Sequence, residues 1–242
     1  MSMSWKTLFL SGAIAVSTIL TSIQKVEAYE IRKLKGDGER IGVIVLAYND
    51  NWTSWAGEWI FDKYLRLLMG KRYDSLYISR GKELVLDDVR LSITDALATG
   101  RHIDFMTSTH SGAESFSLGY DQWVRPDEVF AGLLDEETST RLDVSANFGC
   151  DSVPQNEQYL GMGFKTYLGH EGISVGAIAM RSFLRQWLKK CNDIETAVGN
   201  TNTNLNELFD NSIGKWLFQK ISGEDEYLAV LNHFGANEDL CR

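Results

Sequence analysis

The chain has 242 residues and a formal net charge of −9, with 44% hydrophobic and 24% charged residues. This length and composition suffice for one domain with a full hydrophobic core. The acidic balance argues against nucleic acid and against an anionic membrane surface as partners, and it favours a positively charged substrate.

Residues 1–28 have the layout of a secretory signal peptide. Lys6 precedes an uncharged run over 7–23, and a polar stretch then ends on the small residue Ala28. An uncleaved membrane anchor is the alternative, because such a run just reaches the roughly 17 residues that a spanning helix needs. The Ser, Thr and Gly residues in the run favour cleavage, so we expect a secreted or periplasmic protein with no membrane span after cleavage. The removed segment carries two lysines and one glutamate, so residues 29–242 have a net charge of −10.

Residues 29–242 contain no internal repeat, low-complexity tract or Pro/Gly/Ser-rich linker, which predicts a single domain. Apolar runs bounded by turn residues predict strands within it, and apolar residues at helical spacing predict helices. In chain order we expect a strand over 40–50, a helix over 55–71, a strand over 74–80, a helix over 86–100, a strand over 102–112, a helix over 125–137, strands over 141–150 and 164–172, a helix over 175–190, and a helical remainder that includes 205–220.

Strands that alternate with helices of this length indicate βαβ units, a mainly parallel sheet and right-handed crossovers. The predicted fold class is therefore α/β. In such open sheets, ligands bind beyond the carboxyl ends of the strands. We therefore look for functional residues at those ends.

Two reactive side chains lie at predicted strand ends. His110 lies near the end of "HIDFMTSTHSG", and Cys150 ends "RLDVSANFGC". Because sequential strands are often neighbours, we expect both side chains to face one crevice. An imidazole beside a thiol takes its proton or stabilises the thiolate, and the backbone amides of Gly112 and Cys150 would supply hydrogen bonds to a developing oxyanion.

The order of these elements resembles the caspase-like cysteine peptidases, the group that includes caspases, legumains, gingipains and clostripain. The likeness runs from Ile41 to about Lys190. It rests on a strand ending in His close to Gly, a strand ending in Cys about forty residues later, and the stretches "SANFGCDS" and "GFKTYLGHEG". The resemblance implies a three-layer α/β/α sandwich with a mostly parallel sheet, a catalytic dyad of Cys150 and His110, and an oxyanion hole formed by the amides of Gly112 and Cys150.

Three positions depart from the usual pattern of that group. Ser111 stands between His110 and Gly112, where the group usually has Gly directly after the histidine. Gly149 replaces the more usual Ala before the cysteine, and Phe148 stands where basic-specific members often have an acid.

The resemblance predicts an exported endopeptidase that hydrolyses peptide bonds of a peptide or protein substrate through an acyl-enzyme. By that resemblance Glu171, at the end of the strand over 164–172, lies where part of the pocket for the residue before the cut is formed. An acid there would favour Lys or Arg. Asp151 is a second candidate for this role. A solvated acid at a strand end is the structural alternative for both.

Other interpretations stay open at this point. Cys150 shares alternation parity with Phe148 and would fit as the end of an apolar strand face, and His110 would fit as a surface histidine, which would make the protein a non-catalytic binding or scaffold protein. A Cys-nucleophile α/β-hydrolase would use Cys150, a later Asp and His233. A zinc site at His110 and Glu114 lacks further ligands, and no nucleotide loop or cofactor motif is evident, so we expect neither metal nor cofactor.

The three cysteines form an odd number, which in an exported protein leaves one thiol unpaired. Cys191 follows the helix over 175–190, and Cys241 is the penultimate residue. We expect these two to form a disulfide bond that ties the C-terminal tail to that helix, with Cys150 as the free thiol.

Overall fold

The structure is a computed structural model that describes residues 29–36, 38–47, 64–119, 122–222, 224, 227 and 229–238. The expected signal peptide lies outside the described residues, as does most of the expected helix over 55–71. The last turn of that helix is present as α3 (Arg66–Met69).

A seven-stranded sheet forms the centre of the molecule, in the order β1-β3-β2-β4-β7-β8-β9. The strands from β3 to β8 in this order are parallel, and β1 and β9 are antiparallel strands at the two edges. Their bounds are β1 (Tyr29–Lys33), β2 (Arg40–Leu46), β3 (Ser75–Arg80), β4 (His102–Ser108), β7 (Leu142–Asn147), β8 (Thr166–Glu171) and β9 (Val230–Gly235). A separate short hairpin consists of β5 (Phe116–Leu118) and β6 (Gln122–Val124).

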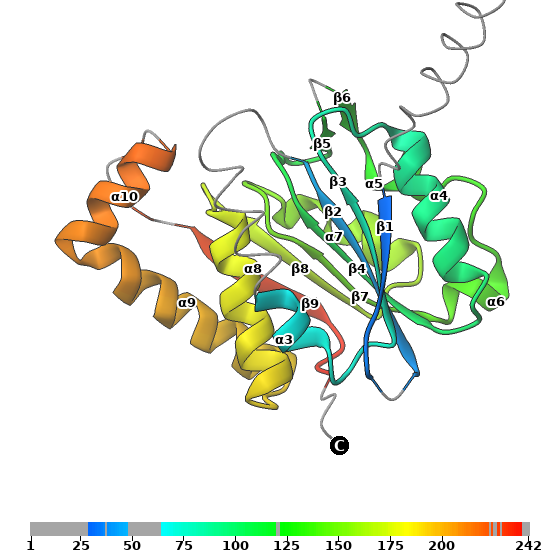
Figure 1. Cartoon of the computed structure of the whole chain (residues 1–242). Coiled ribbons are helices and arrows are strands. Elements are labelled where there is room, and N and C mark those ends of the chain that lie inside the picture. The colour runs from blue at the N-terminus through cyan, green and yellow to red at the C-terminus, as the bar shows by residue number, and fades with distance from the viewer. Residues whose placement is uncertain are drawn as a thin grey trace, which may run out of the picture.

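Helices cover both faces of the sheet, so the molecule has three layers (Figure 1). One layer contains α4 (Leu86–Leu97), α5 (Pro126–Phe130), α6 (Glu136–Ser139) and α7 (Asn156–Gly161), which follows a 3-10 turn (Val153–Gln155). The other contains α3, α8 (Gly176–Leu184), a π-helical turn (Arg185–Lys189), α9 (Ile194–Asp210) and α10 (Ser212–Ser222). This confirms the predicted class, an α/β/α sandwich with a mostly parallel sheet. No helix among the described residues is long and apolar enough to span a membrane.

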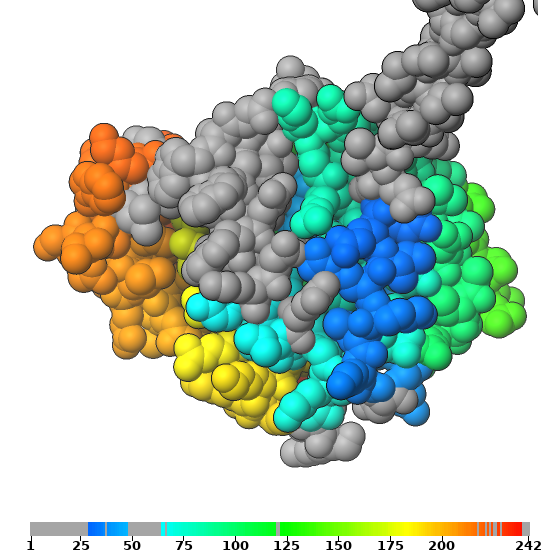
Figure 2. Space-filling model, in the orientation of Figure 1, coloured from blue at the N-terminus to red at the C-terminus, as the bar shows by residue number. Residues whose placement is uncertain are grey.

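The central strand β2 is a long apolar run because both of its faces are covered. In β2, Val43 and Val45 pack in the layer of α4, whereas Ile44 packs in the layer of α3 and α8, and all three are fully buried. Parallel strands enclosed by helices have this composition. In contrast, β1 is an edge strand and lies on the surface in Figure 2.

Four strands that the sequence does not predict complete the structure: β1, the two strands of the β5–β6 hairpin, and β9. The expectation of a helical C-terminal segment is wrong at β9. Only Leu231 of this edge strand is deeply buried, so its sequence lacks the alternation that identifies a strand. Its antiparallel pairing with β8, from Thr166 with Gly235 to Glu171 with Val230, holds it in place.

The expected helix over 125–137 is two short helices. α5 ends at Phe130, and Gly132 then adopts a φ of +68°, which glycine reaches without steric cost. Asp135 begins α6 by accepting a hydrogen bond from the amide of Thr138 at 2.7 Å.

A charge cluster joins the amino ends of β2, β4 and β7. Arg40 lies 2.7 Å from Asp104, 2.8 Å from Asp143 and 2.9 Å from Glu238, and Tyr73 donates to Asp104 at 2.6 Å. Burial raises the pKa values of Asp104 and Glu238, although Arg40 acts to lower them. The cluster ties the C-terminal segment to the sheet at the edge opposite the carboxyl ends of the strands.

Candidate active site

β4 and β7 are parallel neighbours, so their carboxyl ends meet at one edge of the sheet. The last residues paired between them are Thr107 and Asn147. His110 and Cys150 each lie three residues further along their chains. The two strand ends are therefore adjacent, as the sequence predicts.

Cys150 lies in a tight turn that is fixed by the next residue. Asp151 has a φ of +46°, in the left-handed region that non-glycine residues rarely adopt. Its amide donates to the carbonyl oxygen of Gly172 at 3.1 Å, and its carboxylate accepts from the amide of Gly172 at 2.9 Å. This reciprocal pair compensates for the unfavourable backbone conformation and joins the turn to the loop after β8.

The thiol of Cys150 is half-buried and free. Its Sγ donates a long hydrogen bond to the carbonyl oxygen of Ser174 at 3.9 Å. Burial raises the pKa of Cys150, and the charge of Asp151 raises it further, while a backbone hydrogen bond with Ser174 acts in the opposite direction. Because an ordinary thiol already has a pKa above 7, Cys150 is protonated at neutral pH in this conformation.

His110 is exposed, and its backbone is better fixed than its side chain. Its carbonyl oxygen accepts from the amide of Ser117 at 2.8 Å and from the hydroxyl of Thr109 at 3.0 Å. The imidazole forms no side-chain hydrogen bond with another described residue, Cys150 included. The structure therefore brings the two strand ends together without a hydrogen bond between the two side chains.

Some backbone amides near the carboxyl ends of β4 and β7 already donate a hydrogen bond within the protein, and others do not. The amide of Gly112 donates to the carbonyl oxygen of Ser115 at 2.9 Å, so in this conformation it cannot serve as the expected oxyanion donor. The physical reason is the hairpin turn that brings Ser111 opposite Phe116. Within the described part of the chain, no other residue accepts a hydrogen bond from the amides of Ser111 and Cys150.

The loop after β4 packs directly against the turn before the cysteine. A Cβ atom on Gly149 would lie 2.3 Å from the Cβ of Ser111 and 2.5 Å from the carbonyl oxygen of Thr109. Non-bonded contacts of a Cβ atom are essentially never this short, so only glycine fits at position 149 in this conformation. Ser111 and Gly149, two of the three positions that depart from the usual pattern, therefore lie against each other.

Asn147 and Gln155 are two further candidate functional residues, through their side-chain amides, that the sequence did not indicate. Both side chains are fully buried, and both contact the hydroxyl of Ser111. A polar residue at the end of an apolar strand, directly before Phe148 and Gly149, was the signal that could have identified Asn147.

The candidate substrate-binding acids lie at the same edge of the sheet. β8 is the next strand after β7, with Gly169 paired with Asn147, and Glu171 ends it as an exposed residue. Asp151 is also exposed, but its carboxylate is bonded to the amide of Gly172. Glu171 has the carboxylate more accessible to a ligand.

An aromatic cluster lies in the α9–α10 region. Tyr227 packs on Phe209 and Phe218, with ring centroids 4.7 and 5.2 Å away. Burial raises the pKa of Tyr227, and the proximity of Cys150 raises it further. Tyr227 is therefore electrostatically coupled to Cys150.

The other described histidines lie away from the thiol or beneath the surface. His170 is fully buried beside Phe148, and burial lowers its pKa to about 3. His102 contacts Asp143 in the charge cluster. His233 bonds the carbonyl oxygen of Ala236 near the amino end of β8, so the hydrolase arrangement of Cys150 with His233 is not formed.

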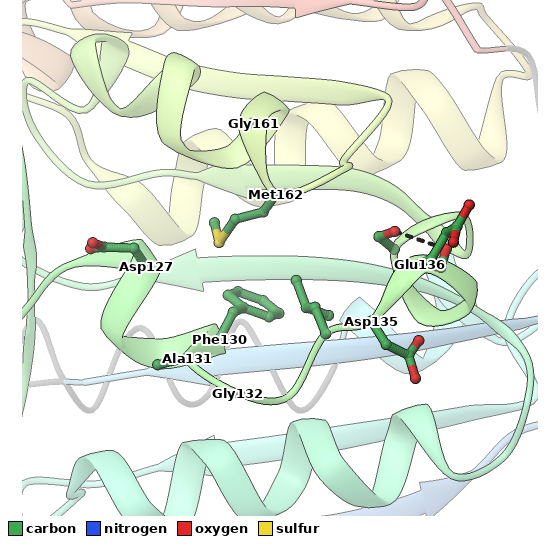
Figure 3. A pocket seen from close by; sticks show the side chains of 10 residues that line it. Asp127, Phe130, Ala131, Gly132, Asp135, Glu136, Gly161 and Met162 are labelled. Carbon is green, nitrogen blue, oxygen red and sulfur yellow. Dashed lines mark hydrogen bonds between the residues drawn. The ribbon is translucent and has the colours of Figure 1, made fainter.

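A cavity of about 450 Å³ lies at the opposite edge of the sheet (Figure 3). It is bounded by the loops that precede β7 and β8, with Phe130 and Met162 in its wall and Asp127, Asp135 and Glu136 around it. Neither His110 nor Cys150 lines it. Among the described residues no group of three or more His, Cys, Asp and Glu side chains is placed to hold a metal ion.

The cysteine pairing is partly visible. Cys191 is disulfide-bonded, and Cys150 is free, as predicted. Cys241, the expected partner, lies outside the described residues. The amide of Ile194 donates to the carbonyl oxygen of Glu238 at 3.1 Å, so the C-terminal segment does meet the start of α9.

Comparisons with known proteins bear on the fold. No protein-family model matches the sequence, and no curated protein matches it. The structure is similar to a solved one described as "structure of pro-sf-caspase-1", with a TM-score of 0.52, 10% sequence identity, and coverage of 84% of this chain and 96% of that chain. At this level of identity the likeness concerns fold alone. The chain has a caspase-like α/β/α fold.

Proposed function

We propose that this chain is an exported caspase-like cysteine endopeptidase in which Cys150 is the nucleophile and His110 transfers the proton. The observation that carries the proposal is the parallel pairing of β4 and β7, which brings the two residues to one edge of a caspase-like sheet. The free thiol at the end of β7 and the exposed imidazole after β4 supply the two groups that the reaction needs.

The chemistry follows from these two groups. His110 accepts the thiol proton as Sγ of Cys150 attacks the scissile carbonyl carbon, which forms a carbon–sulfur bond. The carbon–nitrogen bond then breaks, and the leaving amine takes the proton from His110. Water, deprotonated by the same imidazole, hydrolyses the thioester and returns the thiol. Because no hydrogen bond joins the imidazole and the thiol in this conformation, the two side chains must come closer when substrate binds.

The amides of Ser111 and Cys150 are the best candidates for the oxyanion hole. Both lack another acceptor within the described residues, whereas the amide of Gly112 is occupied by Ser115. The carbonyl oxygen of the substrate becomes negative in the tetrahedral intermediate, and two preorganised amides stabilise that charge. This assignment replaces the expected role of Gly112.

Specificity for a basic residue before the cut follows from charge. Glu171 ends β8 beside the turn of Cys150 and is exposed, and the mature chain is acidic overall. A carboxylate there would pair with Lys or Arg of the substrate. Cleavage after residue 28 would place the enzyme outside the cytoplasm, where its substrates would be peptides or proteins.

The test is peptide hydrolysis by the full chain and by matched variants. We expect the wild type to hydrolyse fluorogenic peptides with Arg or Lys before the bond, and Cys150→Ser and His110→Ala to lose activity by about 100-fold or more. His233→Ala is the control and should retain activity, because His233 bonds Ala236 at the other edge. Undiminished hydrolysis by Cys150→Ser would overturn the proposal.

A non-catalytic binding protein is the second candidate. The raised pKa of Cys150 and the lack of a hydrogen bond between its thiol and His110 favour it. Such a protein would leave every peptide intact while binding basic peptides at the same edge, and its Cys150 would react with iodoacetamide no faster than in the unfolded chain.

A further inference from the structure

The loop that carries His110 is joined to the turn that carries Cys150 by a buried polar cluster, which consists of Ser111, Asn147 and Gln155. Asn147 ends β7, Gln155 ends the 3-10 turn after Cys150, and Ser111 follows His110. The side chains of Asn147 and Gln155 are fully buried. Buried amides are costly unless their hydrogen bonds are satisfied, so their partners define what the cluster holds.

The amide of Asn147 connects the two strand ends. Its Nδ2 donates to the Ser111 hydroxyl at 3.0 Å and to the side-chain Oε1 of Gln155 at 3.0 Å. Its Oδ1 accepts from the backbone amide of Gly149 at 2.9 Å. One side chain therefore contacts the residue after His110 and the residue before Cys150.

The side-chain amide of Gln155 holds together the short turn from Ser111 to Phe116, which directly follows His110. Its Nε2 lies 2.8 Å from the carbonyl oxygen of Gly112 and 3.1 Å from both the carbonyl oxygen of Ser115 and the hydroxyl of Ser111. The carbonyl oxygens of Gly112 and Ser115, on the two sides of this turn, thus share Nε2 of Gln155 as their donor. The turn is thereby fixed against the segment that follows Cys150.

The hydroxyl of Ser111 is central to the cluster. It accepts from Asn147 and Gln155 and donates to the carbonyl oxygen of Ser115 at 3.4 Å, which uses its full hydrogen-bonding capacity. Below it, the absence of a side chain at Gly149 lets the two backbones meet at contact distance. Hydrogen bonding and packing together set the separation of the two strand ends.

We propose that Ser111, Asn147 and Gln155 are positioning residues that set the place from which His110 activates Cys150. This inference rests on the proposed pairing of His110 with Cys150. None of the three side chains is assigned a contact with substrate. Their role is to fix the backbone on either side of the reacting pair, and an enzyme needs that placement to be accurate to within a fraction of an ångström.

The test is a double-mutant cycle on the rate at which Cys150 is alkylated by a substrate-like probe, a peptidyl acyloxymethyl ketone that carries Arg next to the reactive carbon, measured at neutral pH on the full chain. In the wild type we expect His110→Ala to slow alkylation by about tenfold or more, because the imidazole no longer takes the thiol proton. Asn147→Asp keeps the shape but replaces two donor hydrogens by an acceptor, so Asn147→Asp should slow alkylation by itself. In that background, His110→Ala should then have little further effect.

Asn202→Asp is the matched control. Asn202 also bridges two elements through its amide, which bonds the backbone amide and carbonyl of Leu231 at 2.9 Å each, but it lies on α9. We expect the effect of His110→Ala to persist in this background. Ser111→Ala, which removes only the hydroxyl, tests the same prediction if Asn147→Asp does not fold, as judged by circular dichroism.

The outcomes separate the two proposals. An equal effect of His110→Ala in the wild type and in folded cluster variants would overturn the positioning role while leaving the dyad intact. No effect of His110→Ala in any background would overturn the pairing itself, and the positioning role with it. A His110-dependent alkylation rate that disappears in the cluster variants, without hydrolysis of any peptide, would support the positioning role and count against the peptidase.

The pH profile gives a second readout that a role in stability alone would not change. A protonated Asp at position 147 can again donate a hydrogen bond, so the alkylation rate of folded Asn147→Asp relative to wild type should rise as the pH falls. A ratio that stays constant with pH, at constant helix content, would contradict the proposed donor role.

Discussion

Ser111 and Gly149 lie so close together in space that a Cβ atom on Gly149 would lie 2.3 Å from the Cβ of Ser111. This chain has Ser111 directly after His110 and Gly149 directly before Cys150. The close approach of the two strand ends depends on the absence of a side chain at Gly149.

Gly149→Ala should destabilise the protein by about 1–3 kcal/mol, which is typical of overpacking in a closed site. Ser111→Gly together with Gly149→Ala should restore only part of that loss, because the carbonyl oxygen of Thr109 would still lie 2.5 Å from the new Cβ. Urea unfolding of the two single variants and the double variant measures this. Equal midpoints for wild type and Gly149→Ala would contradict the observed packing.

Arg40→Met should destabilise the protein by about 3–5 kcal/mol at neutral pH, because it leaves the buried carboxylates of Asp104 and Asp143 without their guanidinium partner. Arg40→Lys should restore part of the stability, since it keeps the charge but not the forked geometry. Burial already raises the pKa of Asp104.

The pKa of Asp104 is therefore higher in the folded protein than in the unfolded chain. The stabilisation that comes from protonating Asp104 is present at low pH and is lost as the pH rises. The deficit of Arg40→Met should thus grow between about pH 4 and neutral pH, as measured by urea unfolding. A deficit that does not depend on pH would contradict the assignment of Asp104 as the group left unpaired.

The buried imidazole of His170 should make the protein less stable in acid. Burial lowers its pKa to about 3, well below the unfolded value near 6.5. The unfolded chain then binds a proton that the folded one does not, so this contribution is complete above about pH 6.5 and is lost progressively down to about pH 3. His170→Leu should flatten the decline of unfolding free energy between pH 7 and pH 4, by an amount on the order of several kcal/mol. An unchanged decline would show that another group causes it.

Glu171→Gln should reduce kcat/KM for peptides with Arg before the bond by about tenfold and leave peptides with a neutral residue there nearly unaffected. Asp151→Asn should have a smaller effect on this preference, because the Asp151 carboxylate bonds the amide of Gly172. Glu195→Gln, an exposed acid on α9, is the control. A preference for Arg that survives Glu171→Gln would place the specificity elsewhere.

Much of the fold could be predicted because the central strands are buried on both faces. The apolar run of β2 follows from that burial, and the adjacency of the strand ends that precede His110 and Cys150 follows from the parallel order of β4 and β7. β9 could not be predicted, because an edge strand with one deeply buried residue carries no alternating pattern.

The details of the site depended on contacts that no local pattern encodes. The amide of Gly112 is occupied because the chain turns back at Ser115 to begin β5. The cluster of Ser111, Asn147 and Gln155 combines residues from three separate segments. Residue type and position at the strand ends were enough to propose His110 and Cys150 as a pair, while the contacts around them depend on tertiary structure.

The central claim is that His110 activates Cys150 for attack on a peptide carbonyl. The most direct test is incubation of the full chain with a peptidyl acyloxymethyl ketone that carries Arg next to the reactive carbon, followed by mass-spectrometric peptide mapping. We expect one adduct, on Cys150, that forms much faster in the folded wild type than in the urea-unfolded chain or in His110→Ala. Labelling at equal rates in the folded and unfolded chains would contradict the account.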